Sequence, residues 1–176
     1  MKPPTGYCKL PAIKRCLMWS IVSMDRTLTI LLGEDNIDDV ELMKIAFKRA
    51  DLSNPVQVCR DGEEVIAYLE GKGRYADHER HPFPRLLILD LKMPKLSGLD
   101  VLRWVKEHPA CCVIPTVILS TSMRKGDVQE AYALGANAYL SKPFDTGELK
   151  ASLHDLFQFW SRCELPDLPA QHPGCT

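Results

Sequence analysis

The chain has 176 residues, 45% of them hydrophobic and 26% charged, as expected of one globular domain with spare residues at its ends. Its formal net charge of −1 does not indicate a nucleic-acid-binding protein, and we expect neither nucleic acid nor a membrane as a partner. No apolar run reaches the roughly 18–20 residues that a membrane-spanning helix needs. The 7 cysteines form neither a C-x-x-C motif nor a zinc-like Cys/His spacing, which favours reduced thiols and a cytoplasmic protein.

Residues 1–26 differ from the sequence that follows them. They contain scattered Lys and Arg residues and a short apolar patch at 16–22, which is a minimal core for a signal peptide. No A-x-A-like cleavage site follows this patch, and Met24 leads almost directly into the first predicted strand. We therefore expect an N-terminal extension that is either disordered or an artefact of the assigned start, with Met24 as the alternative first residue.

From residue 27 onward, strands and helices alternate regularly. Apolar runs predict strands at residues 28–32, 56–59, 86–89, 113–119 and 138–140. Helical spacing of apolar residues predicts helices after the capping residues Asn36, Asp61 and Ser97, over residues 127–134 and over residues 145–160. This alternation predicts βαβ units, and therefore a parallel sheet with helices on both faces.

The predicted loop at residues 71–85 is long for a connection in an α/β protein. Loops of this length are commonly functional or mobile. It contains His78 and His81 in H-x-x-H spacing, but no third ligand lies near them in the sequence. A solvated surface loop is the favoured interpretation, and a metal site is the alternative.

The stretch LLILDLKMPKLSG, residues 86–98, is the most informative part of the chain. Its first four residues are all apolar, which is typical of a central strand that is covered on both faces. Asp90 ends this run, at the carboxyl end of a buried strand, where open α/β sheets bind ligands. The alternative is an aspartate that only caps the turn after the strand.

Right-handed crossovers bring the carboxyl ends of parallel strands to one edge of a sheet. The polar residues expected at that edge are Glu34, Asp35, Asp90, Ser120 and Lys142. Clustered carboxylates repel one another unless a cation joins them, and oxygen ligands of this kind suit Mg²⁺. A carboxylate is also a nucleophile toward phosphorus, while an ammonium and a hydroxyl group stabilise the charge of the phosphoryl oxygens. Taken singly, each residue also fits an ordinary role, as a helix-dipole partner, a strand-end hydroxyl or a solvated charge.

The motifs GEDNIDD, LLILDLKMP, VILSTS and YLSKPF, within residues 27–160, resemble the receiver domain of two-component response regulators. The resemblance implies a flavodoxin-like, doubly wound α/β fold with a five-stranded parallel sheet of order 2-1-3-4-5 and five helices. It divides the chain into the N-terminal extension 1–26, a receiver domain at 27–160 and a C-terminal tail at 161–176.

The resemblance also implies a role for each site residue. Asp90 becomes the phosphoacceptor, Ser120 the switch hydroxyl, Lys142 the phosphoryl-binding lysine and Tyr139 the switch aromatic residue. The implied Mg²⁺ ligands are Glu34, Asp35, Asp90 and the backbone carbonyl of Lys92. Glu34 and Ser120 replace the commoner Asp and Thr but keep a carboxylate and a hydroxyl group at these positions. Thr121 stands where a smaller residue is usual, and we expect it to narrow access to the phosphorylation site.

By the same resemblance, the partner is a sensor histidine kinase. The loop 71–85 and the last helix, with its Phe-Trp pair and Leu-Pro tail, resemble the response regulators of bacterial phytochromes. We expect a stand-alone receiver that acts through protein contacts or a phosphorelay, and that is no enzyme beyond its own phosphorylation and dephosphorylation. We also expect a homodimer through the last helix and the tail, because a monomer would leave Phe159, Trp160, Leu165 and Leu168 in water. The alternative is a tail that folds back over its own domain.

Other classes of protein fit the sequence less well. A haloacid-dehalogenase-like phosphatase needs a second acid two residues after the nucleophile, where this chain has Lys92. A flavodoxin-like carrier of FMN needs a phosphate loop rich in Ser, Thr and Gly after the first strand, but this chain has the acidic pair Glu34 and Asp35 there. A pseudo-receiver that binds partners without phosphorylation remains open.

Overall fold

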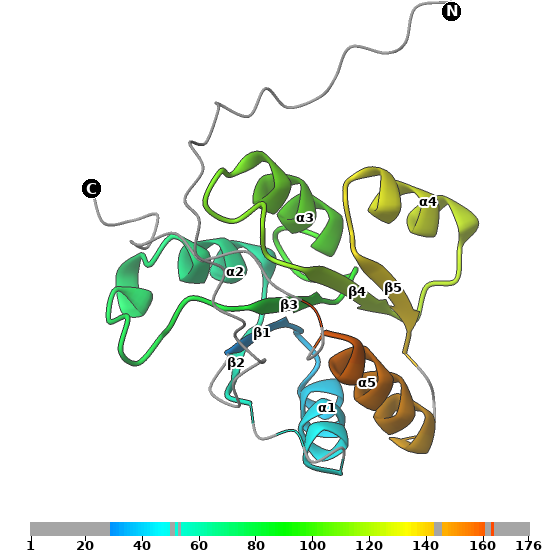
Figure 1. The fold of residues 1–176 in the computed structure, drawn as a ribbon. Helices are drawn as coiled ribbons and strands as arrows, with labels where there is room; N and C mark the ends of the chain where they lie inside the picture. Colours follow the sequence, from blue (N-terminus) through cyan, green and yellow to red (C-terminus); the bar gives the residue numbers. More distant parts are fainter. Residues whose placement is uncertain (1–28, 50–51, 53, 143–145, 161–162, 164–176) are drawn as a thin grey trace, which may run out of the picture.

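The computed structural model describes residues 29–49, 52, 54–142, 146–160 and 163. Its core is a parallel sheet with the strand order β2-β1-β3-β4-β5, which confirms the predicted flavodoxin-like topology (Figure 1). The strands are β1 (Ile30–Gly33), β2 (Val56–Cys59), β3 (Leu86–Leu89), β4 (Thr116–Ser120) and β5 (Ala138–Ser141). The extension at 1–26 and almost all of the tail at 161–176 lie outside the described residues.

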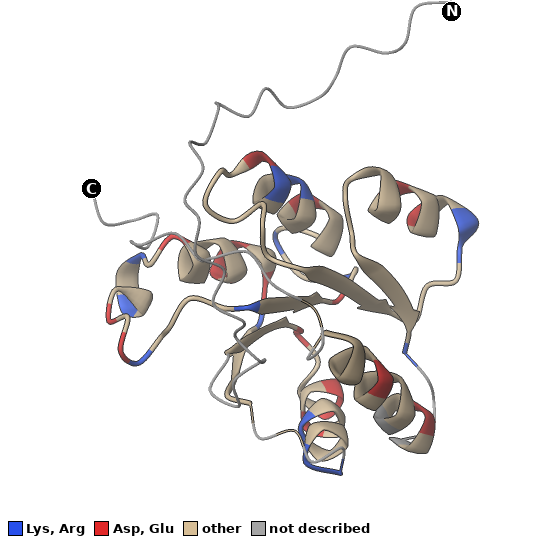
Figure 2. Ribbon diagram, in the orientation of Figure 1, with Lys and Arg blue, Asp and Glu red and all other residues tan. Residues whose placement is uncertain are grey.

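Helices cover both faces of the sheet. They are α1 (Ile37–Arg49), α2 (Gly62–Leu69), α3 (Gly98–Glu107), α4 (Lys125–Ala133) and α5 (Thr146–Trp160), with a short 3-10 turn η1 (Gly73–Tyr75) after α2. Figure 1 shows α1 and α5 on one face and α2, α3 and α4 on the other. Figure 2 shows Lys and Arg beside Asp and Glu on α1 and α3. Among the described residues, no helix is long and apolar enough to cross a membrane.

The central strand β3 is buried along its whole length, as its unbroken apolar run predicts. Leu87 and Leu89 belong to the core beneath α2, α3 and α4. Leu86 and Ile88 belong to the opposite core, beneath α1 and α5. Burying one such side chain is worth about 1.5–3 kcal/mol, so alternate residues of the same strand stabilise both layers.

The largest difference from the sequence prediction is the start of β4. The apolar run predicts a strand at 113–119, but β4 begins at Thr116, and Val113 lies in a turn with 37% of its surface exposed. The Lys106 ammonium contacts the carbonyl oxygens of Cys112 at 3.4 Å and Ile114 at 3.3 Å. The amides of Cys111 and Ile114 also donate to the carbonyls of His108 and Cys111, so the backbone before Thr116 turns and does not extend the strand.

The loop at residues 71–85 packs against α2 and is only partly solvated. The Tyr68 hydroxyl donates a hydrogen bond to the Pro82 carbonyl at 2.8 Å. The rings of Tyr75 and His81 lie edge to face, with their centroids 5.0 Å apart. His78 and His81 are half-buried, and neither belongs to the one group of possible metal ligands among the described residues. Most residues between 72 and 80 are exposed, which agrees with the predicted surface loop, although the two histidine rings are half-buried.

Helix α3 begins at a capping box formed by Ser97 and Asp100, which confirms the start predicted from the sequence. Its first residue, Gly98, lies directly against the end of β3. A Cβ atom at Gly98 would lie 2.2 Å from the carbonyl oxygen of Asp90. Only a residue without a side chain fits between α3 and the strand end.

We expect Gly98→Ala to lower the free energy of unfolding by at least about 2 kcal/mol, because the new methyl group forces the backbone of α3 and β3 apart. Urea unfolding measures this change. The matched control is Gly126→Ala in α4, where a Cβ would meet nothing within 4 Å. The control should be neutral or stabilising by up to about 1 kcal/mol, and equal effects of the two substitutions would contradict the packing described here.

Candidate functional site

The carboxyl ends of the strands meet at one edge of the sheet, and polar residues follow them there. Those placed at this edge are Glu34 and Asp35 after β1, Asp90 after β3, Ser120 at the end of β4 and Lys142 after β5. A backbone hydrogen bond aligns the ends of β1 and β3, since the Asp90 amide donates to the Gly33 carbonyl at 2.8 Å. The structure thus brings the residues predicted from the sequence to a common edge.

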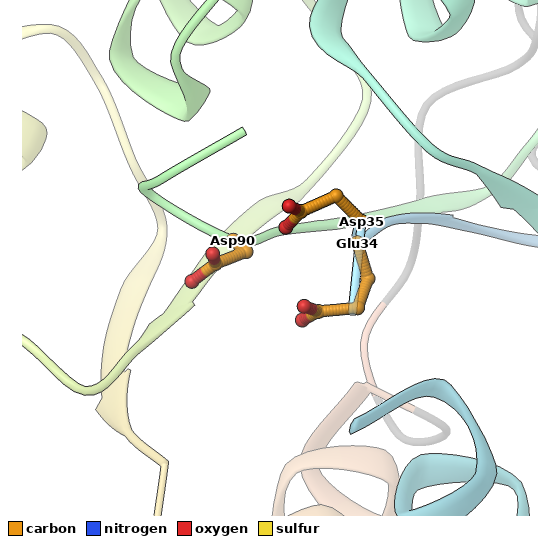
Figure 3. A group of neighbouring side chains, drawn as sticks. All are labelled: Glu34, Asp35 and Asp90. Atoms are coloured by element: carbon orange, nitrogen blue, oxygen red, sulfur yellow. The ribbon is translucent and has the colours of Figure 1, made fainter. Parts of the chain in front are cut away.

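Three carboxylates at this edge form one cluster. Glu34, Asp35 and Asp90 each offer an oxygen, and these oxygens lie within 4.8 Å of one another. Figure 3 shows the side chains of Glu34 and Asp35 extending from the end of β1 toward the side on which Asp90 lies. Glu34 and Asp90 are only 1% and 7% exposed, whereas Asp35 is exposed. An all-oxygen set of this size fits a hard divalent cation such as Mg²⁺, which binds one or two carboxylates and keeps several waters.

Lys142 lies beside this cluster. Its Nζ is 2.6 Å from Glu34 Oε2 and 3.3 Å from Asp90 Oδ1. It is also 2.8 Å from Oδ2 of Asp39 in the first turn of α1, a contact that sequence reasoning missed. Acidic residues in the first turn of a helix are usually explained by the helix dipole, so the spacing in the sequence carried no signal for this contact.

The site contains more carboxylates than ammonium groups. Burial raises the pKa values of Glu34 and Asp90, and the neighbouring Lys142 only partly offsets this rise. Burial would lower the pKa of Lys142, but its hydrogen bonds to Asp39 and Glu34 raise it above the ordinary value. One ammonium is therefore shared among several carboxylates. This excess of negative charge fits a second, divalent cation at the cluster.

The loop between β3 and α3, which contains Lys92, is held against the start of α2. The Lys95 ammonium lies 2.8 Å from Asp61 Oδ2. A Cβ at Gly62 would lie 2.3 Å from the carbonyl oxygen of Leu96, so the two backbones are in direct contact. The Lys92 amide donates a hydrogen bond to the Asp90 carboxylate at 3.2 Å, whereas the metal-binding role of its carbonyl stays a prediction.

Ser120 and Tyr139 both contact the loop after β4 through Ser122. The buried Ser120 hydroxyl accepts a hydrogen bond from the Ser122 amide at 3.2 Å. The Tyr139 hydroxyl donates to the Ser122 carbonyl at 2.7 Å, and burial raises the pKa of this tyrosine. The Ser122 hydroxyl donates to the carboxylate of Asp127 in α4. Sequence reasoning missed Ser122 and Asp127, because only the path of the loop brings them together.

The arrangement suits the transfer of a phosphoryl group to a carboxylate. The Asp90 carboxylate lies at a strand end, 3.3 Å from the Lys142 ammonium, and a carboxylate can act as a nucleophile toward phosphorus. Position 92, where a phosphatase of this chemistry would carry its general acid, holds an exposed lysine. Thr121 is exposed, and its expected effect on access to the site stays a prediction.

Comparison with known proteins identifies the family. The model of the response regulator receiver domain matches residues 30–154. The chain belongs to the response regulator receiver family. It is 36% identical to the response regulator Rcp1 of Synechocystis sp. over 141 residues, covering 80% of this chain and 92% of Rcp1.

Solved structures of this receiver family are also similar. The response regulator RPA3017 in red light signalling of R. palustris is 33% identical, with a TM-score of 0.76, over 80% of this chain and 99% of that one. The phosphorylated cyanobacterial phytochrome response regulator RcpA is 34% identical, with a TM-score of 0.73, over the same shares. The Mn²⁺-bound form of Rcp1 is 34% identical, with a TM-score of 0.70, again over 80% and 99%. Receiver domains bind a divalent metal ion, and the acidic cluster of this chain provides suitable ligands.

We expect Lys142→Ala to preserve Mg²⁺ binding and to tighten it by about two- to tenfold, because the ammonium competes with the ion for Glu34 and Asp90. Isothermal titration calorimetry measures the affinity. Lys44→Ala is the control, since it removes the same charge from an exposed pair on α1. Loss of Mg²⁺ binding in Lys142→Ala alone would mean that the lysine supports the metal site and does not compete with the ion.

Proposed function

We propose that this protein is a phosphoryl-accepting receiver in which Asp90 takes a phosphoryl group from the phosphohistidine of a sensor histidine kinase. The observation that carries this proposal is the position of the Asp90 carboxylate, within the acidic cluster and 3.3 Å from the Lys142 ammonium. A nucleophilic carboxylate, a fixed cation and a set of metal ligands are the parts that phosphoryl transfer to aspartate requires.

In the proposed reaction, an oxygen of Asp90 forms a bond to phosphorus while the P–N bond of the phosphohistidine breaks. The imidazole leaves with the electron pair of that bond. Lys142 binds a phosphoryl oxygen and neutralises part of its charge, and the Ser120 hydroxyl donates a hydrogen bond to another. When Ser120 turns to the phosphoryl group, its hydrogen bond with the Ser122 amide changes. Because Tyr139 is also hydrogen-bonded to Ser122, the conformation of the loop after β4 changes as well.

The ion of this site is proposed to be Mg²⁺. Glu34, Asp35, Asp90 and the backbone carbonyl of Lys92 would hold it. When bound, Mg²⁺ neutralises the charge that develops on the phosphoryl oxygens. The excess of buried negative charge around Lys142 supports this assignment.

The proposed kinase is a phytochrome-type sensor. This rests on the similarity to RPA3017, described in red light signalling, and to the phytochrome response regulator RcpA. Since ATP supplies the phosphoryl group of a histidine kinase, we place the exchange in the cytoplasm. The output is a contact with another protein or a further phosphoryl transfer, with neither nucleic acid nor a membrane as the partner.

Asp90→Asn should abolish phosphorylation and leave the fold intact, because an amide has nearly the shape of the carboxylate but is a poor nucleophile. Intact mass after incubation with acetyl phosphate and Mg²⁺ measures the change. The wild-type chain and the control Asp38→Asn should each gain one phosphoryl mass, and Asp90→Asn should gain none. Labelling of Asp90→Asn would refute the site, whereas no labelling of the wild type would favour a pseudo-receiver.

We also propose a homodimer formed through α5 and the tail. One side of α5 is buried and carries Leu149, Leu153 and Phe157. The ring centroids of Phe157 and of Phe47 in α1 are 5.5 Å apart. Phe159 lies off this side and is 61% exposed, whereas Trp160, which the sequence predicts to be exposed as well, is half-buried. It lines a pocket with Asp155, Gln158 and Cys163 at the end of the helix. Leu165 and Leu168, which the sequence assigns to the same interface, lie outside the described residues.

Phe159→Glu should convert a dimer into a monomer at micromolar concentration, because a buried carboxylate would remain unpaired at the interface. Multi-angle light scattering of the full chain measures the mass. Met123→Glu is the matched control: it places the same charge at a side chain that is 79% exposed, in the loop after β4. A monomeric wild-type chain would refute the dimer and favour a tail that folds back over its own domain.

A further inference from the structure

Asp39 is a charged residue of the site that the proposed reaction does not use. It lies in the first turn of α1, and its carboxylate is 31% exposed. The Asn36 side chain accepts hydrogen bonds from the amides of Asp38 at 2.8 Å and Asp39 at 3.4 Å. This cap fixes the backbone of Asp39 at the edge where β1 and β5 end, and its Oδ2 reaches to 2.8 Å from the Lys142 ammonium.

The Lys142 ammonium is shared among three carboxylates. An ammonium has three N–H donors, and Glu34, Asp39 and Asp90 lie 2.6, 2.8 and 3.3 Å from it. Glu34 and Asp90 also belong to the acidic cluster that fits a divalent cation, whereas Asp39 does not. Asp39 is thus the one of these three partners that stays available to the lysine when the cluster holds a cation.

We propose that Asp39 is a positioning residue: it holds the Lys142 ammonium on the α1 side of the site, so that a divalent cation can take Glu34 and Asp90. This inference rests on the proposed function, because it gives the cluster a metal ion. Asp39 lies outside the metal site and attracts the competing Lys142 ammonium away from the metal ligands.

The physical reason is competition between two cations for the same oxygens. The Lys142 side chain is only 12% exposed, so it cannot move into water without leaving its partners. A divalent cation at Glu34 and Asp90 takes their lone pairs and repels the ammonium. Without Asp39, Glu34 and Asp90 are the counter-charges left to the ammonium among the described residues, and the metal ion must displace it from both.

Asp38 provides a matched control. It precedes Asp39 in the same helical turn, is exposed, and has no ion pair among the residues that the structure describes. Asp38→Asn and Asp39→Asn remove the same charge from nearly the same position relative to the helix dipole. The part of their difference that depends on the presence of Lys142 therefore reports the contact with Lys142.

The experiment is a double-mutant cycle on Mg²⁺ affinity, measured by calorimetry on the full chain. We expect Asp39→Asn to weaken Mg²⁺ binding about three- to tenfold more than Asp38→Asn does. In the Lys142→Ala background, the two substitutions should have equal effects, because no ammonium is left to return to the metal ligands. Asp39→Glu should restore part of the affinity. Equal effects of Asp38→Asn and Asp39→Asn in the presence of Lys142 would overturn the proposal.

A second measurement tests the contact without metal. Urea unfolding in EDTA should show coupling between Asp39→Asn and Lys142→Ala, and none between Asp38→Asn and Lys142→Ala. Absence of coupling would overturn the proposal, even if phosphorylation of Asp90 succeeds. If instead the coupling is found but the wild type gains no phosphoryl mass, the proposed function fails while the positioning of Lys142 by Asp39 stands.

Discussion

The ion-pair network around Lys142 is the interaction on which the site depends. Its ammonium joins residues of three separate segments: Glu34 after β1, Asp39 in α1 and Asp90 after β3. A buried ammonium with several carboxylate partners is stable only while those partners are held close, since an unpaired buried charge is costly. Lys142 therefore balances the charge of an acidic cluster and at the same time joins the two central strands to the edge strand β5.

The strand order explains why these residues meet. Strands β1 and β3 are neighbours at the centre of the sheet, with Gly33 in register with Leu89, so the residues that follow them emerge side by side. The chain reaches β2 on one side of β1 and β4 on the other side of β3. This is the point at which a doubly wound sheet reverses its strand order, and the edge beside it is where such folds bind their ligands.

Much of the fold could be predicted from the sequence because local patterns and global packing agree. The run before Asp90 is apolar on both faces of the sheet, and the Ser97–Asp100 capping box marks the start of α3. The start of β4 was predicted wrongly, since an apolar run does not record that the backbone turns before Thr116, with the amides of Cys111 and Ile114 bonded to earlier carbonyls. At the site, too, local patterns predict some features and tertiary packing decides others. Strand-end residues are visible in the sequence, but the contact of Asp39 depends on how α1 packs, and the contact between Ser122 and Asp127 depends on the path of one loop.

The close approach of Gly62 to the loop after β3 has a genetic consequence. A side chain at this position would meet the main-chain carbonyl oxygen of Leu96, at 2.3 Å from its Cβ. In a screen for loss of signalling, substitutions at Gly62 would resemble mutations of the site, although they change none of its functional groups. Changing the side chain at position 96 should not suppress them, because every residue there has the same carbonyl oxygen.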